Sequence, residues 1–229
     1  TSPSLLRSSR TPRRVLCLCF AGLTGSALLA AAQAAPQPLD AATLWKMQRV
    51  GAPALTPDGK FAIVTLTRYD MELNKGQTDL WRIPTAGGAA EQLTSDPASE
   101  SEPEVSPDGR WVLFSAKRDE DKAAQLYVLP LAGGEARRLT NVPTGAGSAK
   151  WFTDSRRIAF LSAVWPDLPD FAAQGKRLKE REDSKMSGRV YERAPVTYWD
   201  HFLNDRETHV WVTTLEGRTP TSPTLAARR

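Results

Sequence analysis

Thiols and imidazoles are scarce in this sequence. Its 229 residues include two cysteines, Cys17 and Cys19, and two histidines, His201 and His209. Both cysteines fall in an N-terminal stretch that reads as a leader, so we expect the mature chain to have no disulfide and no thiolate metal site. The histidines have no Asp or Glu at helical ligand spacing, which predicts no metal site and no cofactor.

The sequence also lacks the Gly-x-Ser-x-Gly pattern of a nucleophile elbow. The nearest match is Gly147-Ser148, where Lys150 stands in place of the second glycine. Without this turn no activated serine and no oxyanion hole can be assigned. His201 follows Asp200, but neighbouring residues on a strand point to opposite faces. We therefore predict no catalytic residue in this chain and a structural role for both histidines.

An excess of basic charge is confined to the start of the chain. The formal net charge is +4, and Arg7, Arg10, Arg13 and Arg14 are the charged residues that precede Asp40. Without these four arginines the chain is formally neutral. This balance argues against a nucleic-acid partner.

Residues 1–34 resemble a secretory signal peptide. They combine an arginine-bearing start, an apolar run over 15–32 and small residues around Ala32 and Ala34. A single membrane anchor is the alternative, but the run contains Gly22 and Gly25 and is followed by an uncharged Pro-containing segment, which favours cleavage. We expect a periplasmic or secreted protein with no membrane contact after cleavage.

A ten-residue stretch recurs along the chain. Residues 106–115 (SPDGRWVLFS) repeat residues 56–65 (TPDGKFAIVT), and a degraded copy starts at Thr153, with Ser155 aligned to Asp and Arg156 to Gly. Pro presets one backbone angle of such a turn and Gly accepts a positive φ. For Asp58 and Asp108, hydrogen bonding to the turn backbone is therefore a better interpretation than catalysis.

Each copy introduces the same series of predicted strands. A β-branched and aromatic strand follows the turn (61–66, 111–115 and 158–162), then a second strand (79–83, 125–129 and 209–213). Gly-Gly hairpins at 87–88 and 133–134 lead to last strands at 92–94 and 138–140. A short helix over 41–50, capped by Asp40, precedes the first unit.

Short strands at a period in the upper forties indicate blades of a β-propeller. The predicted fold is all-β, an incomplete propeller of about three blades over 35–217; a β-sandwich, the competing interpretation, does not predict a fixed repeat of turn and hairpin. The blades are expected at about 53–95, 101–141 and 148–217. Residues 218–229 show no β pattern and are interpreted as a disordered tail or as a truncated or frame-shifted end.

The third unit is interrupted by an insertion at 163–208. Its middle, 175–191, is densely charged, which is typical of a solvated loop or a surface helix, and we expect it to be partly helical.

The order of these features resembles the propeller half of a prolyl oligopeptidase-family serine peptidase, in its acylaminoacyl-peptidase and dipeptidyl-peptidase branch. The resemblance covers residues 38–217 and rests on the exported leader, the tandem Pro-Asp-Gly blades and the insertion that leads to Tyr198-Trp199-Asp200-His201. It implies a propeller that filters access to a separate α/β-hydrolase domain with a Ser, Asp, His triad. In such peptidases, those that release dipeptides hold the substrate's free amine with acidic side chains of the propeller. Glu180 and Glu182 are the candidates for that role here, and no motif supports the assignment.

We therefore expect the substrate-gating part of an exported serine peptidase that acts on short peptides, inactive alone because the hydrolase domain is absent. The expected partner is a peptide substrate, which would be bound together with the missing C-terminal hydrolase domain. The alternative is a non-enzymatic periplasmic propeller that binds a protein partner, similar to the propeller of the Tol system, which shares the Pro-Asp-Gly blades.

Overall fold

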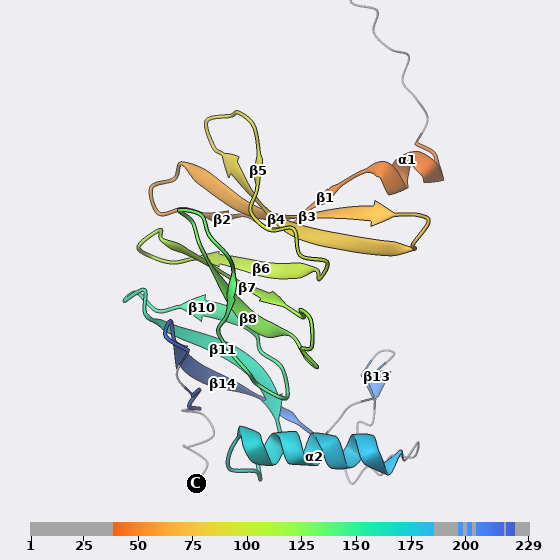
Figure 1. Ribbon diagram of the computed structural model, residues 1–229, viewed down its shortest axis with the longest axis vertical. Helices are drawn as coiled ribbons and strands as arrows, with labels where there is room; N and C mark the ends of the chain where they lie inside the picture. The colour runs from red at the N-terminus through yellow and green to blue at the C-terminus, as the bar shows by residue number, and fades with distance from the viewer. Residues whose placement is uncertain (1–38, 186–196, 199–200, 203–204, 218, 223–229) are drawn as a thin grey trace, which may run out of the picture. The chain divides into compact units, whose positions relative to one another are not determined.

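The computed structural model describes residues 39–185, 197–198, 201–202, 205–217 and 219–222, all of which belong to one compact unit, Leu39–Arg229. The predicted leader, including both cysteines, and most of the predicted tail lie outside these residues. The described part consists of antiparallel sheets that follow one another along the chain (Figure 1). The predicted fold class, an incomplete β-propeller, is confirmed.

The first sheet has five strands in the order β1-β3-β4-β5, with β2 also paired to β3. Its strands are β1 (Arg49–Val50), β2 (Ala54–Leu55), β3 (Phe61–Asp70), β4 (Lys75–Pro84) and β5 (Glu91–Gln92). The second sheet has the order β6-β7-β8-β9. Its strands are β6 (Glu100–Val105), β7 (Trp111–Ala116), β8 (Gln125–Pro130) and β9 (Arg137–Arg138).

The third sheet has the order β10-β11-β14, and β12 pairs with β13 in a separate ribbon. These strands are β10 (Gly147–Trp151), β11 (Arg157–Val164), β12 (Thr197–Tyr198), β13 (His201–Phe202) and β14 (Glu207–Thr214). A helix, α2 (Phe171–Ser184), lies between β11 and β12 in the chain. The insertion is therefore partly helical, as predicted.

Both faces of the middle sheet are buried, which explains why β7 is apolar at consecutive positions. Val112 and Phe114 pack with Ile63 and Leu80 of the first sheet, whereas Leu113 joins the core of the third sheet. That second core also contains Leu126, Ile158, Phe160, Val164 and Trp211. Burying each large apolar side chain stabilises the fold by about 1.5–3 kcal/mol. Stacking of blades therefore supplies the core that no single sheet could form.

The N-terminal helix is shorter than predicted. The helix α1 spans Ala41–Lys46, with the Asp40 carboxylate accepting the N–H of Thr43 at 2.7 Å, so the predicted cap is correct. Arg49 and Val50 form strand β1, which pairs with Thr67 and Leu66 of β3. Arg49 and Val50 fit the helical pattern of the sequence, but they form backbone hydrogen bonds to β3 instead. A local sequence pattern does not show such a distant partner.

The degraded third turn is in a different register from the predicted one. The Asp154 carboxylate accepts the N–H of Arg156 at 2.9 Å, as Asp58 and Asp108 accept the N–H groups of Lys60 and Arg110 at 3.1 Å. Asp154 is thus the Asp of the turn, 46 residues after Asp108. The predicted third copy, which began at Thr153, was therefore wrong by one residue: the copy begins at Phe152. The error arose because Phe152 replaces the threonine or serine that begins the other two turns.

Ser155 consequently occupies the glycine position of the third turn. Its φ is +55°, close to the +69° of Gly59 and Gly109. The left-handed conformation is unfavourable for a serine, but the hydroxyl accepts the N–H of Asp108 in the preceding blade at 3.0 Å. The third turn therefore keeps its geometry and adds a contact between blades.

The third sheet also has the start of a fourth strand, which the sequence did not predict. Val212 and Thr221 exchange backbone hydrogen bonds of 2.8 and 2.9 Å, in an isolated bridge. In the second sheet Val128 pairs with Arg137 at the corresponding place. The residues around Thr221 contain no run of β-branched residues, so the local sequence does not predict a strand there. The bridge forms because β14 offers a backbone partner.

Candidate functional site

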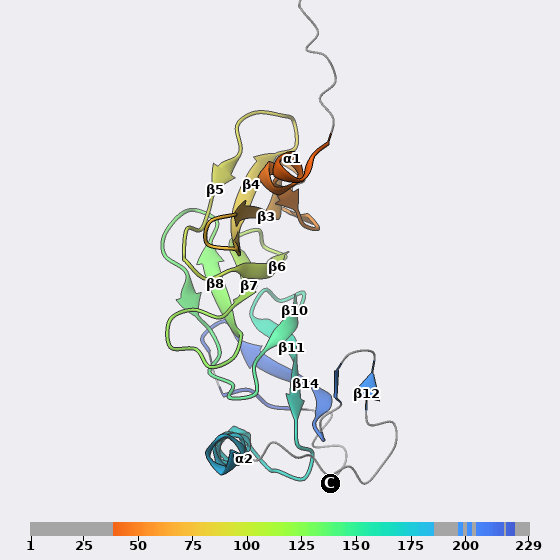
Figure 2. The ribbon, with the colours of Figure 1, turned by 90° about the vertical axis from the view of Figure 1, so that its right-hand side faces the viewer.

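The helix of the insertion, α2, packs against the propeller at its N-terminal end; Figure 2 shows the helix end-on below the sheets. Asp170 caps α2 by accepting the N–H of Ala173 at 2.8 Å. Phe171 meets the Trp211 ring with centroids 4.1 Å apart, and Gly175 lies so close to Pro143 that a Cβ would be 3.5 Å from its ring. The start of α2 is thereby held against the propeller.

Gln174 is the buried residue of this helix, with 1% of its surface exposed. Its side-chain oxygen accepts the N–H of Trp165 at 2.9 Å, and its nitrogen donates to the Trp165 carbonyl at 2.8 Å. One amide thus satisfies both backbone groups of a residue that has just left β11. The charge-rich pattern of the helix hid this residue, since a single glutamine gives no periodic signal.

Arginines of the insertion gather around the buried Trp165 ring, at 4.7 Å for Arg181, 5.4 Å for Arg177 and 5.7 Å for Arg206. Arg177 forms a bidentate pair with Asp167 at 2.8–3.0 Å, and its hydrogen bonds hold the pKa of that carboxyl below its usual value. The positive charge of Arg177 is therefore neutralised within the insertion.

Arg181 makes a second bidentate pair, with Asp205, at 2.6–2.9 Å. The hydrogen bonds from Arg181 are the main cause that lowers the pKa of Asp205. Because Asp205 lies just before β14, this pair joins the helix to the far end of the insertion. The pair fixes α2 at its C-terminal half, as Phe171 and Gln174 do at its N-terminal half.

A cleft of about 480 Å³ lies between α2 and the loops of the second blade. Asp121 on its wall is buried and accepts from Arg138 and from the Tyr127 hydroxyl, both at 2.7 Å. Burial and this carboxylate raise the pKa of Tyr127 to about 12. Lys122 and Glu182 face each other at 3.6 Å, both largely exposed. The cleft is polar and charged, which suits a peptide or another polar ligand better than an apolar one.

His209 lies inside the third sheet rather than at a surface. It is 4% exposed, its Nε2 is 3.7 Å from the Glu207 carboxylate, and it pairs in register with Ser162. The Ser162 hydroxyl is buried and bonds to Thr144 Oγ and to the Gly145 carbonyl, at 2.8 and 2.6 Å. A serine and a histidine thus face each other, but neither can meet a substrate.

The other sequence candidates are not brought together. His201 is part of β13, and Asp200 lies outside the described residues. Glu180 pairs with Lys176 at 3.9 Å on the exposed face of α2, and its neighbour Glu182 lines the cleft instead. Among the described residues no group of three or more His, Cys, Asp or Glu side chains could hold a metal ion. In the same part of the chain no helix is long and apolar enough to cross a membrane.

Asp58 and Asp108 cap their turns, as predicted. Each carboxylate accepts a backbone N–H at 3.1 Å and the hydroxyl of the residue two positions before it, Thr56 at 2.6 Å and Ser106 at 2.5 Å. These bonds, led by the one from Thr56, lower the pKa of Asp58. A carboxylate so occupied is a structural element of the turn.

Comparison with known proteins agrees with this architecture. Residues 75–167 match the model of the Tricorn protease N-terminal beta propeller domain. Dipeptidyl-peptidase 5 of Porphyromonas gingivalis is 31% identical over 159 residues, which are 69% of this chain and 22% of that protein. The chain thus spans about a fifth of the length of this curated relative.

Solved structures show the same fold at low sequence identity. An acylaminoacyl peptidase in complex with Z-Gly-Gly-Phe-chloromethyl ketone matches 79% of this chain and 26% of its own, with a TM-score of 0.57 and 22% identity. Acylaminoacyl peptidase of Pyrococcus horikoshii gives a TM-score of 0.56 at 20% identity over the same shares. The AtxE2 isopeptidase gives 0.57 at 16% identity, over 84% of this chain and 33% of its own.

These matches agree with one another in the part of the protein that they cover. Each relates this chain to a propeller or to a minor part of a longer peptidase. The predicted resemblance to the propeller portion of the prolyl oligopeptidase-family serine peptidases, in the acylaminoacyl-peptidase and dipeptidyl-peptidase branch, is confirmed.

Proposed function

We propose that this chain is the substrate-gating propeller part of an exported serine peptidase that acts on short peptides. The observation that carries the proposal is the joint similarity to a dipeptidyl-peptidase in sequence and to acylaminoacyl peptidases in fold. The cleft beneath α2 agrees with it, since its mixture of Lys122, Glu182 and buried Asp121 suits a zwitterionic peptide.

The catalytic step is assigned to a separate α/β-hydrolase segment. Ser162 lies opposite His209 in strand register, but it is buried and its hydroxyl is bonded to Gly145 and Thr144. The sequence has no Gly-x-Ser-x-Gly turn. Activation of a serine needs a base within hydrogen-bond reach and donors for the developing oxyanion, both accessible to the substrate. The blades and the helix would then control which peptides reach the nucleophile.

The experiment is to read the coding sequence that follows residue 229 in all frames and to assay the purified chain. We expect a Gly-x-Ser-x-Gly hydrolase segment in one frame, and no hydrolysis of aminoacyl or dipeptidyl p-nitroanilides by the chain alone. Further blades followed by a stop codon would contradict the peptidase role and favour a propeller that binds a protein partner. Export is tested separately, by N-terminal sequencing of the protein from the periplasmic fraction, with cleavage expected after Ala34.

A further inference from the structure

The repeated turns meet at both junctions between successive blades, and the contact between the turns differs in one hydrogen bond. In the second junction the Ser155 hydroxyl accepts the N–H of Asp108 at 3.0 Å. In the first junction Gly109 stands at the position of Ser155, and Asp58 at that of Asp108. The Asp58 N–H has no hydrogen-bond partner among the described residues. A hydrogen bond that one junction makes is thus missing from the other.

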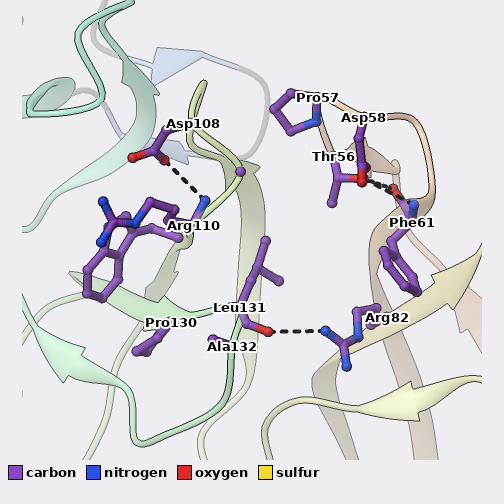
Figure 3. Close-up of a pocket in the computed structure, with 12 residues that line it drawn as sticks. Thr56, Pro57, Asp58, Phe61, Arg82, Asp108, Arg110, Pro130, Leu131 and Ala132 are labelled. Atoms are coloured by element: carbon purple, nitrogen blue, oxygen red, sulfur yellow. Dashed lines mark hydrogen bonds between the residues drawn. The ribbon is translucent and has the colours of Figure 1, made fainter.

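A groove of about 590 Å³ occupies this first junction (Figure 3). Most of its wall is apolar: Pro57, Phe61, Trp111, Pro130, Leu131 and Ala132. Arg82 is held across it, because its guanidinium donates to the Leu131 carbonyl at 3.1 Å and pairs with Glu91. Figure 3 shows the Arg82–Leu131 bond on one side of the groove and Arg110 on the other.

The polar groups at the groove define the chemistry of an occupant. The Asp58 N–H makes no hydrogen bond within the described residues and can donate to an acceptor oxygen of a ligand. The exposed Arg110 guanidinium, which has no side-chain partner in the same part of the chain, offers further donors. Asp58 pairs with Lys60 at 3.4 Å, and Arg82 pairs with Glu91. The remaining charges on the lining are therefore one of each sign, Asp108 and Arg110. An uncharged ligand with carbonyl oxygens beside apolar groups therefore fits better than an ion of either sign.

We propose that this groove binds an extended, uncharged peptide segment that contains proline or another apolar side chain. A peptide carbonyl would accept the Asp58 N–H, as the Ser155 hydroxyl accepts that of Asp108, and the apolar side chain would pack between Phe61 and Trp111. Aromatic-lined grooves favour proline-rich segments, since these are extended before they bind and lose little entropy. Binding does not depend on the proposed peptidase role, because it requires no hydrolase segment.

The test is calorimetric titration of the 229-residue chain with acetyl-Ala-Pro-Phe-Pro-Ala-amide, with the Asp58 amide followed by NMR. We expect saturable binding and a shift of the Asp58 resonance. The variant Gly109→Ser gives the second turn the serine that the third turn has at this position. The new side chain would enter the groove, with its Cβ 3.4 Å from Pro57. Because it both fills space and competes for one hydrogen bond, it should weaken binding by about tenfold or more.

Arg110→Ala should weaken binding by about threefold or more, because Arg110 is exposed and water screens the hydrogen bond that is lost. Arg156→Ala is the matched control, since Arg156 holds the same place in the third turn, away from the groove. Thermal denaturation of each variant shows whether it is folded. Absence of binding at millimolar peptide overturns the proposal. So does equal binding by folded Gly109→Ser, or tighter binding of a peptide with two glutamates or two lysines.

Discussion

Replacing Gln174 by alanine tests whether the insertion helix is a fixed part of the propeller. The side chain is 1% exposed and satisfies both the N–H and the carbonyl of Trp165. The substitution leaves two buried backbone groups unpaired, and each unsatisfied group costs about 1–3 kcal/mol. Partial access of water will recover some of this, so we expect the docking of α2 to weaken by about 2–4 kcal/mol.

Hydrogen exchange of the α2 amides measures this change directly. Since about 1.4 kcal/mol corresponds to a tenfold change in an equilibrium constant, exchange should accelerate by about 30-fold to 1000-fold in residues 174–184. Amides of β7 and β8, which lie in the core of the blades, should keep their protection. Lys179→Ala, on the same helix, is the control and should leave exchange within about threefold of the native rate. Unchanged exchange in Gln174→Ala would refute the docking role.

Two turn residues give further predictions. Hydrogen bonds from Arg157 and Arg156 lower the pKa of Asp154 to about 2. The ionised carboxylate therefore stabilises the fold above the unfolded pKa of 3.8, and this contribution is lost as the pH falls through about 2. In urea titrations Asp154→Asn should flatten the dependence of stability on pH between these two values, and an NMR pKa near 3.8 for Asp154 would contradict this. Ser155→Ala and Ser155→Gly both lose the bond to Asp108, but alanine keeps the strained φ of +55°, which glycine accepts. Ser155→Ala should therefore unfold at lower urea than Ser155→Gly, and the reverse order would contradict the backbone strain at this position.

Repetition made most of the fold predictable. The Pro-Asp-Gly turns, the apolar strands after them and the Gly-Gly hairpins recur, and a recurring pattern that must bury both faces of a sheet specifies stacked blades. Errors arose where the repeat was degraded or where a distant strand decided the outcome. The third turn was misregistered because Phe152 replaces a hydroxyl residue, and Arg49 and Val50 left the helix for a partner on β3.

The candidate site was less predictable than the fold. The charge-rich stretch of the insertion suggested a solvated surface, and its charged side chains up to Lys185, where the described part of the stretch ends, are mostly exposed. The contacts that fix it, from Gln174 to Trp165 and from Arg181 to Asp205, join residues without a periodic or local relation. The groove of the first junction was likewise hidden, because it depends on comparing Gly109 with Ser155 after the true register is known.

Capture of the native protein from its source cells tests whether this chain is the propeller part of a serine peptidase, as we propose. The antibody is raised against the α1–β2 segment, residues 41–55, and the captured protein is treated with a fluorophosphonate probe. We predict that the captured polypeptide is several times longer than 229 residues and is labelled at a serine outside the propeller. The separately expressed 229-residue chain should remain unlabelled. Capture of a polypeptide that resists the probe, or labelling within residues 39–217, would contradict the account.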